Sequence, residues 1–512
     1  MESSSSKYAR WFQTDAIKPH LKSKSIRGGA FMFVSSSANL VLGIAATAVL
    51  ARILVPADFG LLGMVFALTA IAERFKDIGL GKATVQKKEL THSEVSNLFW
   101  LNFAIGIGIS LAICLLSGAI SNFYHEQRLT RIAMWLSLTF VFGGLTIQHQ
   151  ALLNRQMKFL ASGTIGTTSL VLSNALAIFL AFRGYGYWSL VWRELARSVL
   201  VAIGTFGACP WIPGFPDFKK KVGAQMRFGR DITLFNVVTY FTSSLDQILL
   251  GRFTGATALG FYRQAFQLIM MPISQLTSPM QSVWEPLFSA LQDDAPKYRR
   301  GFEKTVSTVS LITMPLAAGA FMCAPQLVAL LLGQRWSGSV DIARILAVAM
   351  FIRPAITTVG FVMVSCGKTA RYAVLGILDS LTLSAAISLG VMWGARGVAF
   401  GHVAATYVAF LPLVWAALRD TPVNLSLWLR AIARPAVCSL FMVALLYVLF
   451  SLVPLQNNLV AVGLYVPAGV IFYVLGMLVI PGGKNILSDL LRDCQSALSA
   501  KRELQTSPVP AA

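Results

Sequence analysis

The chain has 512 residues, of which 55% are hydrophobic and only 13% are charged, and its mean hydropathy is +0.65. A soluble protein of this length cannot expose so apolar a surface, so the composition excludes a soluble globular domain and indicates a membrane-embedded chain. A net charge of +21 would suggest nucleic acid in a soluble protein. Here the basic residues lie mainly between apolar runs, where they orient the chain in the membrane, and we expect no nucleic-acid partner.

Residues 1–27 form a polar, basic leader that ends abruptly at an apolar run over residues 28–50. A run of about 23 residues is longer than the core of a signal peptide, so we expect it to be retained as the first span. In the leader, basic residues alternate with the apolar residues Tyr8, Trp11, Phe12, Ile17 and Leu21. This pattern fits either a segment that lies flat on an anionic leaflet or a disordered basic tail.

Apolar runs of membrane-crossing length recur along the whole chain. A helix of about 20 residues, at 1.5 Å per residue, crosses the roughly 30 Å hydrocarbon core of a bilayer. We therefore expect an all-α polytopic membrane protein with about fourteen spans. The expected spans are residues 28–50, 60–80, 97–118, 132–151, 162–182, 187–208, 230–251, 264–288, 305–327, 340–365, 371–393, 397–417, 433–453 and 459–480.

The basic residues favour one side of the membrane. When the N-terminus is placed inside, the segments on the inner side collect about 31 of the 43 Lys and Arg residues, and those on the outer side about seven. Cytoplasmic loops are enriched in Lys and Arg. We therefore expect both termini to be cytoplasmic.

The two halves of the chain resemble each other at an offset of 200 residues. Arg52 matches Arg252 and Gly60 matches Gly260, and the other identities also bracket the same span ends. Six spans separate the copies, an even number, so the halves have the same orientation and form a parallel repeat. We expect a leader (1–27), two pseudo-symmetric six-helix lobes (28–208 and 230–417), a cytoplasmic linker between them (209–229), two additional helices (418–480) and a cytoplasmic tail (481–512).

Short motifs occur in a fixed order on this frame. They are Arg52 to Gly60 (RILVPADFG), Asp77 to Leu80 (DIGL), Leu153 to Phe159 (LNRQMKF), Asp246 to Arg252 (DQILLGR), Leu259 to Tyr262 (LGFY) and Leu332 to Trp336 (LGQRW). Over about residues 25 to 420 the chain resembles the polysaccharide-transporter branch of the multidrug/oligosaccharidyl-lipid/polysaccharide exporter superfamily, the Wzx-type lipid-linked oligosaccharide flippases.

The resemblance implies a transporter and not an enzyme. Such a protein flips undecaprenyl-pyrophosphate-linked oligosaccharide units to the periplasmic leaflet of a bacterial inner membrane, for surface polysaccharide, exopolysaccharide or lipopolysaccharide biosynthesis. The implied partners are the lipid-linked oligosaccharide, membrane lipids, and the polysaccharide polymerase and chain-length machinery. No role is implied for the last two spans.

Transport of such a head group requires polar surface inside the membrane. Each unpaired polar group costs roughly 2–7 kcal/mol in hydrocarbon, so a hydrated cavity between the lobes would remove most of the barrier. An Arg at the centre of a span costs about 2.5–3.5 kcal/mol, and several that are retained indicate a polar interior face. Arginines at that depth would bind the diphosphate. The expected cavity cations are Arg74, Arg193, Arg197 and Arg353.

Acidic neighbours of these arginines leave a structural interpretation open. Arg193 and Arg197 share a helix face and could form an ion pair with Glu194, while Arg74 could extend to the cytoplasmic interface. Arg344 could pair with Asp341, three residues away. The acidic candidates for charge partners or for a coupling ion are Glu73, Glu194, Asp246 and Asp379.

Other classes of function fit less well. The five His residues show no metal-ligand spacing and no phosphate-binding glycine loop is visible, so we expect no catalytic residues, no metal, no cofactor and no ATP hydrolysis. A multidrug or cation antiporter of the sister branch would rely on buried carboxylates, whereas Arg is in excess here. A membrane-embedded polymerase would need a sizeable outer loop, and the expected outer loops are roughly 15 residues or shorter.

Overall fold

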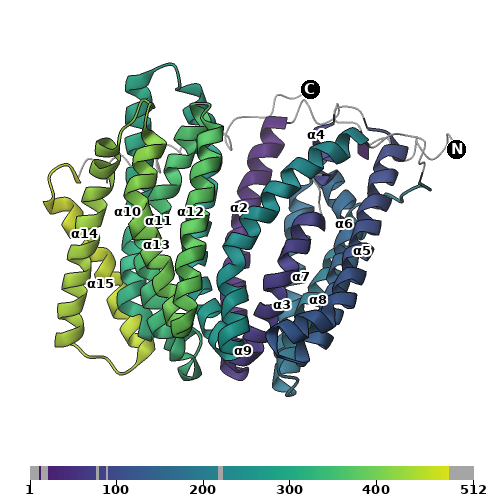
Figure 1. Cartoon of the computed structure of the whole chain (residues 1–512), viewed down its shortest axis with the longest axis horizontal. Coiled ribbons are helices and arrows are strands. Elements are labelled where there is room, and N and C mark those ends of the chain that lie inside the picture. Colours follow the sequence, from purple (N-terminus) through teal and green to yellow (C-terminus); the bar gives the residue numbers. More distant parts are fainter. Residues whose placement is uncertain are drawn as a thin grey trace, which may run out of the picture. The chain divides into compact units, whose positions relative to one another are not determined.

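The computed structural model is built from long helices (Figure 1). It describes residues 8, 11, 12, 21–76, 80–87, 90–216 and 223–483, without the side chains of residues 21–30, 33, 74–76, 223–243, 278, 279, 281–283, 285 and 286. This described part contains fourteen α-helices, two short 3-10 helices and no strand. The expectation of an all-α polytopic fold is therefore confirmed.

Each of the fourteen expected spans overlaps a helix of the described chain. In the first half the helices are α2 (Leu21–Ile53), α3 (Pro56–Lys76), α4 (Leu80–Gln86), α5 (His92–Tyr124), α6 (Arg128–Arg155), α7 (Phe159–Phe182) and α8 (Tyr187–Ala208). In the second half they are α9 (Gly223–Ala290), α10 (Ala295–Leu331), η2 (Gln334–Trp336), α11 (Gly338–Ser365), α12 (Thr369–Gly390), η3 (Val391–Trp393), α13 (Gly394–Leu418), α14 (Leu425–Leu452) and α15 (Asn458–Val479).

Among the described residues, ten segments are long and apolar enough to cross a membrane. One of the ten segments is residues 369–418, which hold two of the expected spans. α8 and the two expected spans within α9 are not among the ten. α8 carries two arginines and a glutamate, which lower its hydropathy. α9 is interrupted at Gly255, whose backbone (φ 83°, ψ 179°) is not helical. The chain is thus a multi-pass membrane protein with a charged helix in its first half.

Polar residues at helix ends explain several of the observed boundaries. Thr91 begins α5 with a capping box, in which its side chain accepts from the backbone of Glu94 and the Glu94 carboxylate accepts from the backbone of Thr91. His125 ends the same helix in the left-handed conformation. Asn424 and Asn457 cap α14 and α15 through side-chain oxygens.

The chain divides into two compact units. In unit 1, α5 packs on α6, α7 on α8, and α2 on α7. In unit 2, one buried cluster surrounds Trp428 and a second joins α14 and α15 to α10 through residues such as Cys438 and Met442. Unit 1 comprises Met1–Arg263, Leu331–Trp336 and Val391–Ala395, and unit 2 comprises Gln264–Leu330, Ser337–Gly390 and Arg396–Ala512. The six-helix lobes expected from the sequence stay a prediction.

Three aromatic residues of the leader are buried in unit 1. Tyr8, Trp11 and Phe12 pack with α5, α6 and the start of the linker around Trp211. Both expectations for these residues, a leaflet-bound segment and a disordered tail, are therefore wrong. The physical reason is that the protein itself offers an apolar site for the three rings, and burial there removes them from water.

Arg155 holds this aromatic segment in place. It is 6% exposed, and its guanidinium donates to the carbonyl of Phe12 from Nε at 3.2 Å and from Nη2 at 2.9 Å. Its Nη1 donates to the carbonyls of Thr84, Val85 and Lys87 at the end of α4. A single side chain of the Leu153 to Phe159 motif thus connects the leader to α4 and α6.

Candidate functional site

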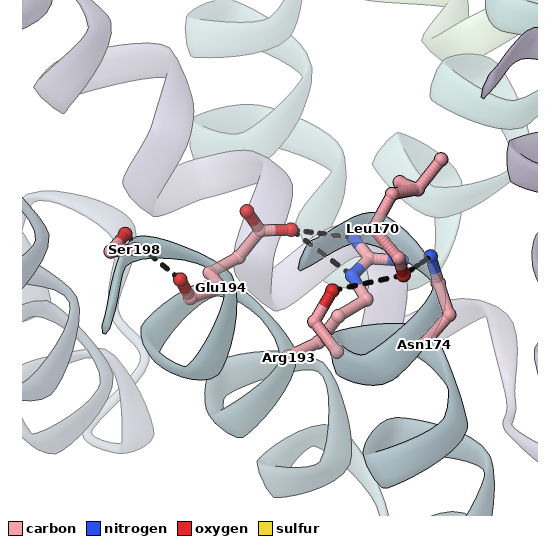
Figure 2. A network of polar contacts seen from close by, with 6 residues as sticks. Leu170, Asn174, Arg193, Glu194 and Ser198 are labelled. Carbon is pink, nitrogen blue, oxygen red and sulfur yellow. Dashed lines mark hydrogen bonds and ion pairs between the residues drawn. The ribbon is translucent and has the colours of Figure 1, made fainter. Parts of the chain in front are cut away.

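The first group of candidate residues lies on α8. Arg193 donates to the Oε1 atom of Glu194 from Nε at 3.1 Å and from Nη2 at 2.8 Å. Figure 2 shows this pair beside Leu170 and Asn174 of α7, the helix on which α8 packs. Both side chains are about one-fifth exposed, at 22% and 23%. The pair is therefore neither sealed in the interior nor fully in solvent.

Arg197 follows one turn later and is exposed. Within the described part of the chain, no ion pair is recorded for its guanidinium. α8 therefore presents one paired and one unpaired arginine on the face that they share, as its spacing suggests. α3 carries one acidic and one basic candidate, Glu73 and Arg74. Glu73 is exposed, and the side chain of Arg74 lies outside the described residues.

The second group joins α11 and α12 in unit 2. Arg353 donates to the carboxylate of Asp379 from Nη2 at 2.7 Å and from Nη1 at 3.4 Å. Each side chain is 27% exposed. Both residues lie near the middle of their helices, so in a membrane this ion pair would lie near the bilayer centre. A charge at that depth is costly unless it is paired, which explains why the two residues meet.

Pro354 breaks the regular hydrogen bonding of α11 next to Arg353. It has no N–H to donate to the carbonyl one turn earlier. Trp428 donates to the carbonyl of Ala355 at 3.2 Å, and Thr357 donates to that of Pro354 at 2.7 Å. Polar side chains therefore accompany the interruption, as expected for an irregular helix within a membrane.

Asp246 has a different environment from the other acidic candidates. It is 3% exposed, accepts a hydrogen bond from the hydroxyl of Tyr262 at 2.7 Å and one from the backbone of Gln247 at 2.7 Å. Tyr262 is fully buried. Because these two side chains lie on either side of Gly255, their hydrogen bond joins the two parts of α9.

The expected contact between Arg344 and Asp341 is not formed. Asp341 instead pairs with Arg396 of α13 at 2.5 Å. The side chains of Arg396 and Asp341 are 66% and 47% exposed, which is more than those of Arg353 and Asp379. They meet near the first turns of α13 and α11. The Nε atom of Arg344 is buried and has no hydrogen-bond partner among the described residues.

The contact between Arg353 and Asp379 was missed from the sequence, although a signal for it existed. Each residue lies thirteen positions from Cys366, which ends α11 at the turn to α12. In an antiparallel helix pair, residues equally distant from the turn lie at the same height because each residue rises 1.5 Å. The charges of opposite sign at equal distance therefore predict the pair.

The chain is similar in sequence to proteins of polysaccharide biosynthesis. A family model described as "Polysaccharide biosynthesis protein" matches residues 49–341, more than half of the chain. The chain is 26% identical over 424 residues to the lipopolysaccharide biosynthesis protein WzxC of Escherichia coli (strain K12), covering 80% of this chain and 85% of that protein. It is 25% identical over 425 residues to the teichuronic acid biosynthesis protein TuaB of Bacillus subtilis (strain 168), covering 81% of this chain and 87% of that protein.

The fold is also found among solved structures. The chain is similar to the lipid II flippase MurJ in an inward closed conformation, with a TM-score of 0.70 over 87% of this chain and 97% of that chain. The sequence identity is 12%. At this identity the likeness establishes a shared helical architecture, and the role of the charged residues has to come from their own chemistry.

Proposed function

The chain belongs to the polysaccharide biosynthesis protein family, and on this premise we propose that it transports undecaprenyl-pyrophosphate-linked oligosaccharide repeat units across the bacterial inner membrane. Near-full-length similarity to two proteins named for lipopolysaccharide and teichuronic acid biosynthesis supports this class of substrate. In this role the chain is a transporter and not an enzyme. A polysaccharide polymerase and chain-length machinery would act on the unit after its release.

The observation that carries the mechanism is the pairing of arginines with carboxylates inside membrane-crossing helices. Arg353 and Arg193 are each held by a carboxylate. A diphosphate offers a stronger, multidentate acceptor for guanidinium than a single carboxylate does. Exchange of one anion for the other would allow the head group to bind without an unpaired buried cation at any stage.

This exchange assigns the acidic residues a role in the transport cycle. When the diphosphate binds the guanidinium of Arg353, the carboxylate of Asp379 loses its partner. It then needs a cation or a proton, because an isolated charge in hydrocarbon is costly. Glu194 would likewise lose its partner when the diphosphate binds Arg193. These two carboxylates are therefore our candidates for coupling transport to an ion. Arg197 and Arg74 would add positive charge along the same hydrated path, through which the unit moves by alternating access.

The distribution of basic residues supports the orientation of the protein in the membrane. The segments between spans that collect Lys and Arg would face the cytoplasm, with both chain termini on that side. The turns after α2, after α5 and after α10 would then face the periplasm. The substrate would enter from the cytoplasmic leaflet and leave at the opposite side.

The experiment is transport by the purified protein in liposomes that contain a fluorescent lipid-linked oligosaccharide. The variants Arg193→Gln, Arg197→Gln and Arg353→Gln keep the length of the side chain and remove its charge, and should transport poorly at normal abundance. Arg396→Gln is the matched control, because Arg396 belongs to an exposed ion pair. Normal transport by all three variants and by the triple variant would refute the assignment of the cations.

A further inference from the structure

The repeat in the sequence reappears as a repeated contact within unit 1. A β-carbon on Gly60 would overlap the carbonyl oxygen of Ala256, and one on Gly260 would overlap that of Pro56. Residues 56 and 256 are themselves 200 apart, as are the two glycines. The same contact is thus made twice, with i meeting j and j meeting i, as in a two-fold symmetric interface. Here α3 and the part of α9 after Gly255 touch through their backbones.

Aromatic and aliphatic side chains close the surroundings of this contact. A β-carbon on Gly63 would lie 3.3 Å from the Cδ2 atom of Leu259, which is fully buried. Trp336 of η2 is also fully buried, and its ring lies edge-to-face with Phe59 and with Phe261 at centroid distances of 5.3 and 6.0 Å. Its indole donates to the carbonyl of Ala51 at 2.8 Å. The side chain of Trp336 thus covers both halves of the repeat.

Four of the sequence motifs meet at this place. The Arg52 to Gly60 and Leu259 to Tyr262 motifs supply the two glycines, and the Leu332 to Trp336 motif supplies the tryptophan. The Asp246 to Arg252 motif supplies the carboxylate that binds Tyr262 across the break at Gly255. Residues that are distant in the sequence therefore build one structure. Of the candidate transport residues, Asp246 is the one that belongs to it, and Arg193, Arg197 and Arg353 are not part of it.

We propose that this structure, the glycine crossing (Gly60, Gly63, Leu259, Gly260 and Trp336), is the outer closure of the transport path and separates once in each transport cycle. The proposal rests on the proposed function and on its orientation, which places the end of α2, the start of α3, the break in α9 and the turn after α10 on the outer side. Alternating access needs a closed outer end while the path is open to the cytoplasm.

The chemistry of the contact suits repeated opening. Where backbones meet at glycine, no side chains interlock, and the weak hydrogen bonds that Cα–H groups make to carbonyl oxygens contribute only about 0.5–1 kcal/mol each. Such a surface seals against water because it is close-packed, and at the two glycines it separates without withdrawing a side chain. Leu259 and Trp336 are buried in the closed state and have to leave their positions when the crossing opens. The symmetric arrangement provides the same surface on both partners, so the contact can form again in one register.

The test is a reversible cross-link across the glycine crossing. In a variant whose six native cysteines are replaced by alanine, Gly63→Cys and Leu259→Cys would place two thiols within reach of a disulfide. Oxidation should abolish transport of the fluorescent lipid-linked oligosaccharide in liposomes, and a reductant should restore it. The control pair Ser110→Cys and Ser137→Cys joins α5 and α6 where the hydroxyls are 3.0 Å apart, and its oxidation should leave transport unchanged.

The outcomes separate this proposal from the proposed function. If the reduced protein transports the substrate and the oxidised protein does so equally well, the glycine crossing does not open and the proposed function stands. If the wild-type protein, assayed in parallel, transports nothing, the proposed function fails and this proposal fails with it. Should the Gly63→Cys variant not fold, Phe59→Cys and Trp336→Cys joined by a short bifunctional maleimide give the same test, since their native rings are in contact.

Discussion

Arg353 of α11 and Asp379 of α12 form an ion pair 2.7 Å long at the middle of both helices. Two roles are compatible with this geometry. The pair could only stabilise the helix packing, or Arg353 could exchange Asp379 for the diphosphate of the substrate. The two roles differ in what happens when both charges are removed together.

Neutralising the pair should separate stability from transport. Arg353→Gln or Asp379→Asn alone leaves one unpaired charge at depth, at a cost of about 2.5–3.5 kcal/mol, and should lower the thermal stability in detergent. The double variant Arg353→Gln/Asp379→Asn leaves neither charge and should regain most of that stability. Transport should stay lost in the double variant, because the cation that binds the diphosphate is absent.

The exposed ion pair of Arg396 and Asp341 provides the comparison. The corresponding double variant Arg396→Gln/Asp341→Asn should change stability by less than about 1 kcal/mol, because exposed pairs contribute little. It should also transport normally. Wild-type transport by the Arg353→Gln/Asp379→Asn variant would show that the charges at mid-helix have a structural role alone.

Arg155 should be required for its planar, forked geometry and not merely for its charge. Arg155→Lys keeps the charge but cannot donate to Phe12 and to the end of α4 together. We expect lower thermal stability and faster proteolysis in the leader. Lys158→Ala is a milder change at the same place, because it removes a cation–π contact 4.1 Å from the ring of Trp11, with an expected cost of about 0.5–1 kcal/mol. An equal effect of the two variants would contradict this assignment.

Alanine at the glycine crossing should be poorly tolerated. Gly60→Ala and Gly260→Ala each place a methyl group on an opposing carbonyl oxygen, so both should lower abundance and stability, and to a similar degree because the contacts are equivalent. Gly118→Ala in α5 has open space around its β-carbon and should gain up to about 1 kcal/mol from helix propensity. The measurement is the thermal stability of the three variants in one detergent. If the Gly60→Ala variant is as stable as the wild-type protein, the close backbone contact is excluded.

The hydropathy of the sequence predicted the positions of the helices. It did not predict the segments whose position depends on tertiary contacts. Ten segments of the described chain are apolar enough to cross a membrane, and one of them holds two expected spans. A bilayer leaves few alternatives to a helix there. The leader shows the limit. Its alternating aromatic and basic residues fit a membrane surface as well as a buried segment, and only the presence of Arg155 and the apolar site near Trp211 distinguishes the two.

The sequence names the candidate residues but does not give all of their contacts. Arg193 and Glu194 are neighbours in the sequence, so their pairing was anticipated. Arg353 and Asp379 were assigned separate roles because 26 positions separate them, although their equal distance from the turn was already visible. Asp341 has two arginines within reach, and helix packing selects Arg396. Sequence spacing alone could not make that choice.

The hydrogen bond between Tyr262 and Asp246 distinguishes a structural carboxylate from a coupling one. If Asp246 holds the two parts of α9 together, Tyr262→Phe and Asp246→Asn should both destabilise the protein, by about 1–3 kcal/mol for a buried partner left unsatisfied. Their effects should then be less than additive in the double variant, since both remove the same bond. If Asp246 instead carries a coupling ion, Asp246→Asn should abolish ion-dependent transport while Tyr262→Phe retains it. Unfolding curves and transport at two ion concentrations, measured on the three variants, decide between these roles, and we expect the structural one because the carboxylate is buried and already accepts two hydrogen bonds.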